Sequence, residues 1–240
     1  MKKIFVITAV LVLSISSAFA GDKVKMGVDD VIISNHDVRI VNLPTAYTLP
    51  RGSYMLNLRL YNNGGLFTYS YFSFSEKFLF GVFMNTSNVI GSKKVIAGTP
   101  KIMAKLKLLD QKNSLPAMAV GYNSIIEVNG EKSDKEFYLA ASRKFAILSG
   151  LLVHAGAYTS TLSKIKMSDV HYYAGITKNF ERGLGLFAEV RDPLDVNGYS
   201  VNAGVKYNFS PELELELIFR SLNTANRLNR EIGVSYSNYF

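Results

Sequence analysis

The 240-residue chain contains no cysteine and no tryptophan, and only 19% of its residues are charged. The absence of cysteine excludes disulfides, thiolate zinc sites, a thiol nucleophile and a lipid-modified N-terminal cysteine. After residue 20, no apolar run approaches the ~20 residues that a membrane-spanning helix requires. Low charge together with 12% aromatic residues also argues against a disordered chain. Because 48% of the residues are hydrophobic, we expect either a soluble β protein or a membrane β-barrel.

The start of the chain has the three parts of a secretory signal. Lys2 and Lys3 form a basic start, residues 4–13 an apolar stretch, and Ala18-Phe19-Ala20 a cleavage site with small residues. We therefore predict that residues 1–20 are a signal peptide. A short signal led by lysines is typical of bacteria. The mature chain is accordingly expected in the periplasm, the outer membrane or the medium.

From Gly52 onward, apolar residues recur with a period of two, which is the period of a β-strand. Between Lys101 and Leu109, apolar residues occupy one face and three lysines the other. The segment from Glu212 to Arg220 shows the same alternation with glutamates in place of the lysines. On a helix these charges would be scattered around the cylinder, so the pattern indicates strands.

Twelve segments of this kind follow one another along the chain. Most have about 9–11 residues, the length that a tilted strand needs to cross a bilayer. Their expected bounds are 52–61, 66–74, 78–86, 101–109, 115–123, 135–144, 150–158, 170–180, 184–191, 199–208, 212–220 and 229–240.

The connections between these segments are alternately short and long. Those after the even-numbered segments are short turns, and those after the odd-numbered ones are mostly longer and polar, except the tight connection at 62–65. Outer-membrane barrels have short periplasmic turns and longer extracellular loops. We therefore predict that residues 52–240 form an all-β fold, a twelve-stranded antiparallel transmembrane β-barrel with short periplasmic turns and longer extracellular loops. A soluble periplasmic β-sandwich is the alternative.

In such a barrel, the apolar residues of each strand face lipid and the polar residues line the lumen. Ala104, Leu186 and Leu215 are expected to face lipid, whereas Met103 and Phe187 are expected in the lumen. The lysines of 101–107 and the glutamates of 212–216 are expected on opposite sides of it. The charged residues expected in the lumen are Arg59, Lys101, Lys105, Lys107, Glu136, Lys144, Glu189, Arg191, Lys206, Glu212, Glu214, Glu216, Arg220 and Glu231.

The last segment carries a second sign of a membrane barrel. The chain ends at Phe240, and Ile232, Val234 and Tyr236 lie on the same face of the strand. A terminal aromatic residue on an alternating strand resembles the signal that the barrel-assembly machinery of the outer membrane reads. The departure from that pattern is Asn238, where an apolar residue is usual.

Three stretches resemble the YjbH-type family of outer-membrane barrels, which is associated with bacterial exopolysaccharide loci. They are Leu43-Pro44-Thr45-Ala46 with Leu49-Pro50-Arg51-Gly52, then residues 115–121 (LPAMAVG), and then Phe137 to Arg143. The resemblance covers about residues 43–210, and the chain would be a minimal, single-barrel member. It implies a role linked to surface polysaccharide, with the polysaccharide or its export components as partners.

The sequence contains little that suggests catalysis. The three histidines, His36, His154 and His171, have no metal-ligand spacing, so no metal or cofactor is expected. The hairpin register across residues 159–169 predicts that His154 lies closer to Gly175 than to His171. His171, with Ser168 and Asp169 close by, is the single candidate for a hydrolase site. The modest positive charge is spread along the chain, which argues against nucleic acid as a partner.

Two functions follow from this reading. The expected one is non-enzymatic: an outer-membrane barrel with either a structural role or a narrow, porin-like pore, in contact with outer-membrane lipid. The alternative is an outer-membrane hydrolase acting on lipid or peptide. Residues 21–51, which precede the barrel, would be an N-terminal lead serving as a periplasmic arm or as a plug in the lumen. The residues themselves do not choose between these roles.

Overall fold

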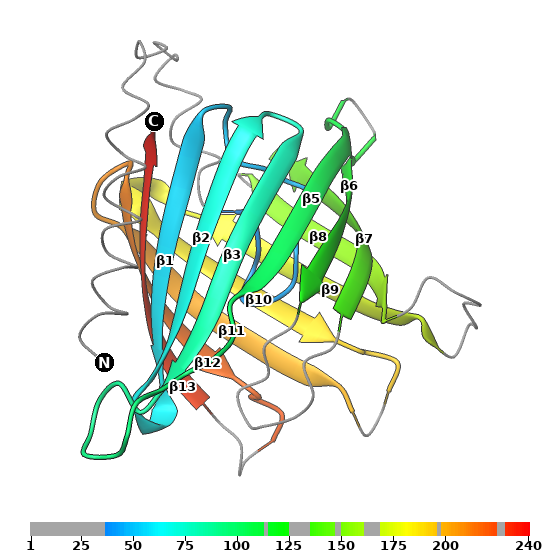
Figure 1. Ribbon diagram of the computed structural model, residues 1–240. Helices are drawn as coiled ribbons and strands as arrows, with labels where there is room; N and C mark the ends of the chain where they lie inside the picture. Colours follow the sequence, from blue (N-terminus) through cyan, green and yellow to red (C-terminus); the bar gives the residue numbers. More distant parts are fainter. Residues whose placement is uncertain are drawn as a thin grey trace.

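The computed structural model describes residues 37–112, 115–124, 135–146, 150–160, 169–195, 198–224 and 229–240. Within these ranges, thirteen strands form one sheet that curves into a barrel (Figure 1). They are β1 (Ser53–Tyr61), β2 (Gly65–Ser75), β3 (Phe78–Ser87), β4 (Ile96–Ala97), β5 (Lys101–Leu109), β6 (Ala117–Ser124), β7 (Lys135–Phe145), β8 (Leu151–Thr159), β9 (His171–Asn179), β10 (Leu184–Arg191), β11 (Ser200–Asn208), β12 (Leu213–Arg220) and β13 (Asn229–Tyr239). Among the described residues, no helix is both long and apolar enough to cross a membrane.

The barrel closes between its first and last strands. β1 pairs antiparallel with β2 and with β13, where Ser53 lies opposite Tyr239. The two-residue β4 pairs with the end of β3, inside the segment 87–100 that was predicted to be a loop. This strand was not predicted because two residues are too few to show an alternating pattern. The other twelve strands complete the ring, which confirms the predicted fold class. The predicted signal peptide lies outside the described residues.

The strand bounds differ from the expected ones by at most two residues. The largest difference is at β6, which was expected from residue 115 and begins at Ala117. Pro116 precedes it, and a proline has no N–H with which to join the sheet ladder. The C-terminus lies beside the start of β1, at the same end of the barrel as the β2–β3 turn (top of Figure 1), so both ends of the barrel sequence lie at the short-turn end.

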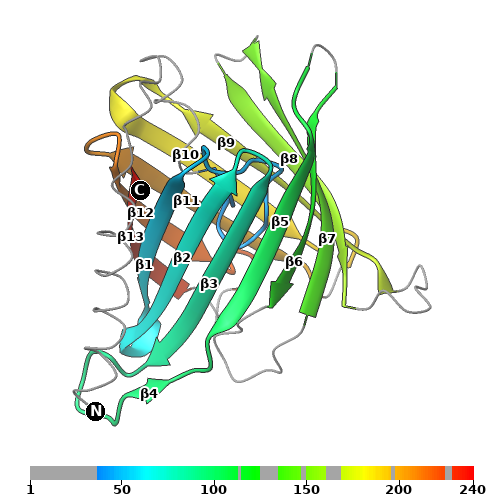
Figure 2. The ribbon, with the colours of Figure 1, turned by 45° about the horizontal axis from the view of Figure 1, so that its top comes forward.

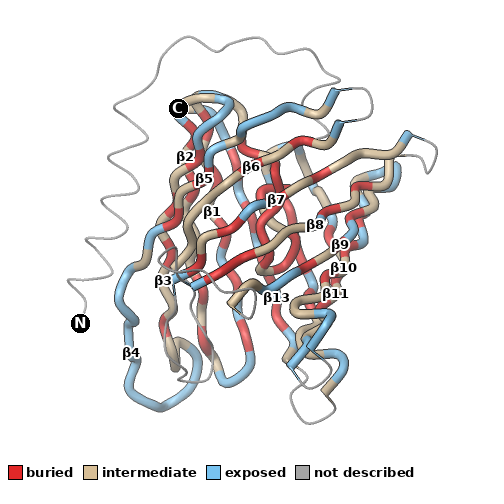
Figure 3. The backbone as a smooth tube through the Cα atoms, turned by 90° about the vertical axis from the view of Figure 1, so that its right-hand side faces the viewer, coloured by how far each residue is buried: buried red, intermediate tan, exposed pale blue. Residues whose placement is uncertain are grey.

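The barrel buries its polar face and exposes its apolar face. Along β12, Glu214 and Glu216 are 1% and 8% exposed, whereas the alternating Leu215 and Leu217 are 38% and 42% exposed. Figure 3 shows buried residues alternating with more exposed ones along the strands. A soluble protein would bury the leucines and leave the glutamates in water. This reversed arrangement is stable where lipid surrounds the outside of the barrel.

Glycines inside the strands make room for aromatic rings in the lumen. Gly121 pairs with Tyr138 across β6 and β7, and Gly156 pairs with Tyr173 across β8 and β9. A Cβ atom at either glycine would lie within 2.4 Å of the Cζ atom of the paired tyrosine. The ring therefore covers the backbone of the glycine. Glycine ordinarily weakens a strand, and here its missing side chain allows the lumen to be filled by rings.

Candidate functional site: a hairpin in the lumen beneath an outer vestibule

Residues 37–51 fold back into the barrel as a hairpin, which we call the lumen hairpin. Its two arms are joined by a hydrogen bond from Thr45 N to Val38 O, and its turn by one from Ile40 N to Leu43 O. The blue segment inside the ring of strands in Figure 2 is this hairpin. The sequence left open whether the lead was an arm or a plug, and the structure places residues 37–49 in the lumen.

The hairpin enters from the short-turn end and returns there. The Thr48 hydroxyl donates a 2.6 Å hydrogen bond to the carbonyl of Glu76 in the β2–β3 turn. The turn of the hairpin, residues 40–43, reaches deeper, to the level of Glu189 on β10 and Arg59 on β1. Side chains from β1, β2, β5, β7, β9, β10 and β11 bond to the hairpin, so it contacts the wall on all sides.

Glu189 fixes the turn of the hairpin. Its carboxylate accepts hydrogen bonds from the backbone N–H groups of Val41, Asn42 and Leu43 at 2.9–3.2 Å. Asn202 donates a further bond of 2.8 Å to the same carboxylate. Hydrogen bonds to a charged acceptor contribute about 1.5–3 kcal/mol each. These four donors therefore offset part of the cost of burying the carboxylate.

Two buried lysines hold the arms of the hairpin. Lys105 on β5 is fully buried and donates to the carbonyls of Val38 and Tyr47, at 2.6 and 2.9 Å. Lys206 on β11 pairs with Asp37 of the hairpin at 2.9 Å and lies 3.6 Å from Glu214.

Burial, and then the charge of Asp37, raise the pKa of the Tyr47 phenol to about 12.

Arg59 joins the hairpin to a network of charges on one side of the barrel. Its guanidinium lies 3.4 Å from Glu216 and 3.6 Å from Glu231, and it donates to the Val41 carbonyl. Glu231 also pairs with Arg220 at 3.0 Å. These acidic residues of β12 and β13 lie beside β1, whereas Lys105 lies on β5. Arg59, which these acidic residues hold in place, and Lys105 therefore bind the hairpin from different sides.

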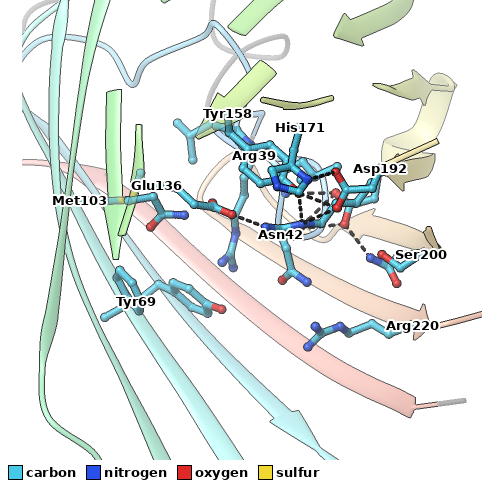
Figure 4. Close-up of a pocket in the computed structure, with 18 of the residues that line it drawn as sticks. Arg39, Asn42, Tyr69, Met103, Glu136, Tyr158, His171, Asp192, Ser200 and Arg220 are labelled. Carbon is cyan, nitrogen blue, oxygen red and sulfur yellow. Dashed lines mark hydrogen bonds and ion pairs between the residues drawn. The ribbon is translucent and has the colours of Figure 1, made fainter. Parts of the chain in front are cut away.

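Above the hairpin, towards the long-loop end, lies a cavity of about 500 Å³ that we call the outer vestibule. Val38, Arg39 and Leu43 of the hairpin form part of its lining, and Tyr69, Tyr71 and Phe83 form an aromatic wall (Figure 4). The Arg39 guanidinium lies over the Tyr69 ring, with 3.7 Å between its Cζ atom and the ring centroid. Such stacking holds a cation against the aromatic wall.

The opposite wall of the outer vestibule is polar. Arg191 of β10 pairs with Glu136 of β7, and its Nε donates 2.7 Å to the Tyr158 hydroxyl. That hydroxyl donates to Asp192, which also lies 3.0 Å from His171 Nδ1. Figure 4 shows Glu136, Tyr158, His171 and Asp192 around this side of the cavity. The vestibule therefore offers charges of both signs and aromatic rings to a solute.

The histidines have other partners than those considered from the sequence. His171 bonds to Asp192, whereas Ser168 lies outside the described residues. His154 pairs with Gly175, as hairpin register predicted, and its Nδ1 lies 2.8 Å from Ser142 Oγ on β7. That serine also accepts the N–H of Ala46, and both side chains are 1% exposed. This pair was not predicted, although both residues lie on lumen positions of neighbouring strands. Within the described ranges, no three His, Asp or Glu residues gather as a metal site.

The charged residues selected from the sequence have different degrees of burial. In the described structure, the buried ones are Arg59, Lys105, Glu136, Glu189, Lys206, Glu214, Glu216 and Glu231. The partly exposed ones are Lys101, Lys107, Lys144, Arg191, Glu212 and Arg220. Lys107 lies towards the short-turn end and pairs with Asp110.

In the last strand, Ile232, Val234 and Tyr236 face outward, and Phe240 N donates to Gly52 O at 2.9 Å.

No protein-family model and no curated protein matches the chain. Among solved structures, the chain is similar to the KdgM porin with a TM-score of 0.54 and 13% identity, over 78% of this chain and 99% of that one. Omp33 of Acinetobacter baumannii matches with a TM-score of 0.41 and 13% identity, over 78% of this chain and 97% of that one. These comparisons do not test the resemblance to the YjbH family or the link to polysaccharide, which stay predictions. The chain has the fold of an outer-membrane porin.

Proposed function

We propose that the protein is a channel of the bacterial outer membrane that its own lumen hairpin holds closed. The outer vestibule would admit a polar solute from outside the cell, and passage would require the hairpin to move. The observation that carries this proposal is the mode of closure. The hairpin is bound by side chains from strands around the barrel, and it is continuous with β1 only at residue 52.

The nature of the contacts supports a closure that can be released. The wall holds the hairpin through hydrogen bonds and ion pairs, which water can replace, as well as through apolar contacts. A lumen meant to stay permanently filled could be packed by the strand side chains alone, as in smaller barrels. A separate segment that the wall holds largely through polar backbone groups is what a removable plug requires.

Planar-bilayer recording tests this proposal. Val41→Pro with Ala46→Pro removes one of the three N–H groups that bond to Glu189 and the one that bonds to Ser142, and it leaves the barrel wall unchanged. We expect the wild type to show no steady conductance and the double-proline variant to conduct. The matched control is Val41→Ile with Ala46→Ser, which keeps both N–H groups and should stay closed. A double-proline variant that forms an intact barrel but carries no current would favour a purely structural role.

A further inference from the structure

The wall of the lumen binds the hairpin largely through the peptide backbone of the hairpin. Lys105 donates to the carbonyls of Val38 and Tyr47. Three further carbonyls of the hairpin each accept a hydrogen bond from the wall. These are Val41 O from Arg59 at 3.2 Å, Pro44 O from the Tyr173 hydroxyl at 3.0 Å, and Leu49 O from the Ser73 hydroxyl at 2.9 Å. The donors come from β1, β2, β5 and β9, so they follow the hairpin along its length.

The wall also provides acceptors for the N–H groups of the hairpin. Glu189 accepts three consecutive N–H groups, and the Ser142 hydroxyl accepts that of Ala46 at 2.8 Å. Donors and acceptors on the wall thus match both halves of the peptide unit. A polypeptide presents this pairing of N–H and C=O at nearly every residue, whatever its side chains. A saccharide or a simple ion does not.

Apolar pockets accompany these polar groups. Val38 and Leu49 of the hairpin pack with Met55, Tyr71, Leu79, Phe83 and Met103, and Leu43 and Ala46 pack with Tyr138, Tyr158 and Tyr173. Ile40 and Val41 pack with Phe187 and Ile218. Aromatic rings and methionine form broad contact surfaces, and methionine adapts to side chains of different shape. The pockets therefore suit a range of small and aliphatic side chains.

We propose that the lumen is a binding site for polypeptide and that the lumen hairpin occupies it as an internal ligand. This deepens the proposed function, because it rests on a hairpin that can leave and names the solute that replaces it. That solute is a peptide with aliphatic side chains, held mainly through its backbone. Lys105 and Glu189 are the recognition groups for its carbonyl and N–H groups.

The covalent connection between the hairpin and β1 explains why the hairpin, and not a free peptide, normally occupies the site. A segment joined to the barrel by a short connection has an effective concentration in the millimolar range. An external peptide at micromolar concentration therefore cannot displace it from the wild type. Weakening the hairpin, without changing the wall, makes the site measurable.

The experiment uses the full-length Val41→Pro/Ala46→Pro protein in detergent micelles. The probe is a fluorescent peptide with the sequence of residues 37–51 and blocked termini, and binding is followed by fluorescence polarisation. We expect saturable binding to the double-proline variant and at least about tenfold weaker binding to the wild type. Heat-modifiable migration on a gel verifies that the barrel is intact. Asp37→Lys, which repels Lys206, is the second hairpin-weakening variant should the prolines prevent folding.

Three comparisons test backbone recognition itself. A peptide N-methylated at the positions of Val41 and Leu43 keeps its side chains but loses two donors to Glu189, and it should bind at least about tenfold more weakly. Lys105→Met added to the double-proline protein should weaken the parent peptide similarly. A peptide with Val38→Ile and Leu43→Ile should bind within about threefold of the parent, because its backbone is unchanged.

The proposal would be overturned if the N-methylated and parent peptides bound equally, or if maltohexaose displaced the peptide. A double-proline variant that conducts but binds no peptide would refute peptide recognition and leave the proposed channel standing. A variant that neither conducts nor binds would refute both.

Discussion

At the scale of single residues, the lumen depends on charges that have no access to water. Arg59 is 0% exposed and lies between Glu216 and Glu231. Arg59→Met would keep much of the volume but leave two buried carboxylates without their shared cation. Breaking a buried ion pair in this way costs about 3–5 kcal/mol. We expect a fall of this size in the free energy of unfolding, measured from denaturant titrations followed by circular dichroism.

Arg51→Met is the matched control, because Arg51 is exposed just before β1. Its effect should be within about 0.5 kcal/mol, as for most surface substitutions. Equal effects of the two changes would mean that the charges around Arg59 contribute nothing to stability.

At the scale of a strand, the two faces should respond differently to a new charge. Leu186 on β10 faces outward and is 44% exposed, so Leu186→Arg would place a guanidinium against lipid. Near the bilayer midplane this costs about 2–4 kcal/mol. Asn123 on β6 lines the outer vestibule, and Asn123→Arg should be tolerated much better. Refolding equilibria into lipid bilayers measure both, and similar costs would mean that the outer face does not contact lipid.

Phe187, which the sequence also placed in the lumen, would not serve as the lumen control. It lies on the inner face as expected, but it packs against Ile40 and Val41 of the hairpin. A charge at Phe187 would disturb the hairpin as well as test the face. A suitable control is a lumen position that does not pack against the hairpin.

The terminal strand carries a prediction about assembly. Phe240→Asp keeps the backbone N–H that bonds to Gly52 but removes the aromatic side chain. We expect a strong loss of outer-membrane insertion in cells, measured by fractionation, with near-normal refolding into detergent in vitro. Asn238→Leu, at an exposed position of the same strand, should be neutral or mildly helpful for insertion. Normal insertion of Phe240→Asp would mean that the assembly machinery does not read this residue.

At the scale of the whole molecule, the closed ring should resist detergent until it is heated. Twelve strands with no free edge unfold together, since an unpaired edge within a membrane is costly. The protein from outer-membrane fractions should therefore migrate differently on a gel before and after boiling. Recovery in a soluble fraction with a single, unchanging mobility would contradict a membrane barrel.

The amino-acid sequence by itself determined the barrel. The period-two alternation of segments such as 101–109 and 212–220 is local, because neighbouring side chains on a strand must point to opposite faces. Short turns are local too, and they determined which successive strands are neighbours. The pairing of His154 with Gly175 followed from this register alone.

Only the tertiary structure decided what fills the barrel. The hydrogen bond from Val41 N to Glu189 joins residues 148 positions apart, and Lys105 reaches the Val38 carbonyl across 67. The wall groups bind the hairpin largely through backbone atoms, which every residue possesses, so no pattern of side chains marks the hairpin as their partner. Strand formation depends on neighbours in sequence. Occupation of the lumen depends on which polar groups the closed ring brings together. Buried groups such as Glu189 and Lys105 need hydrogen-bond partners inside the lumen, and the hairpin provides them.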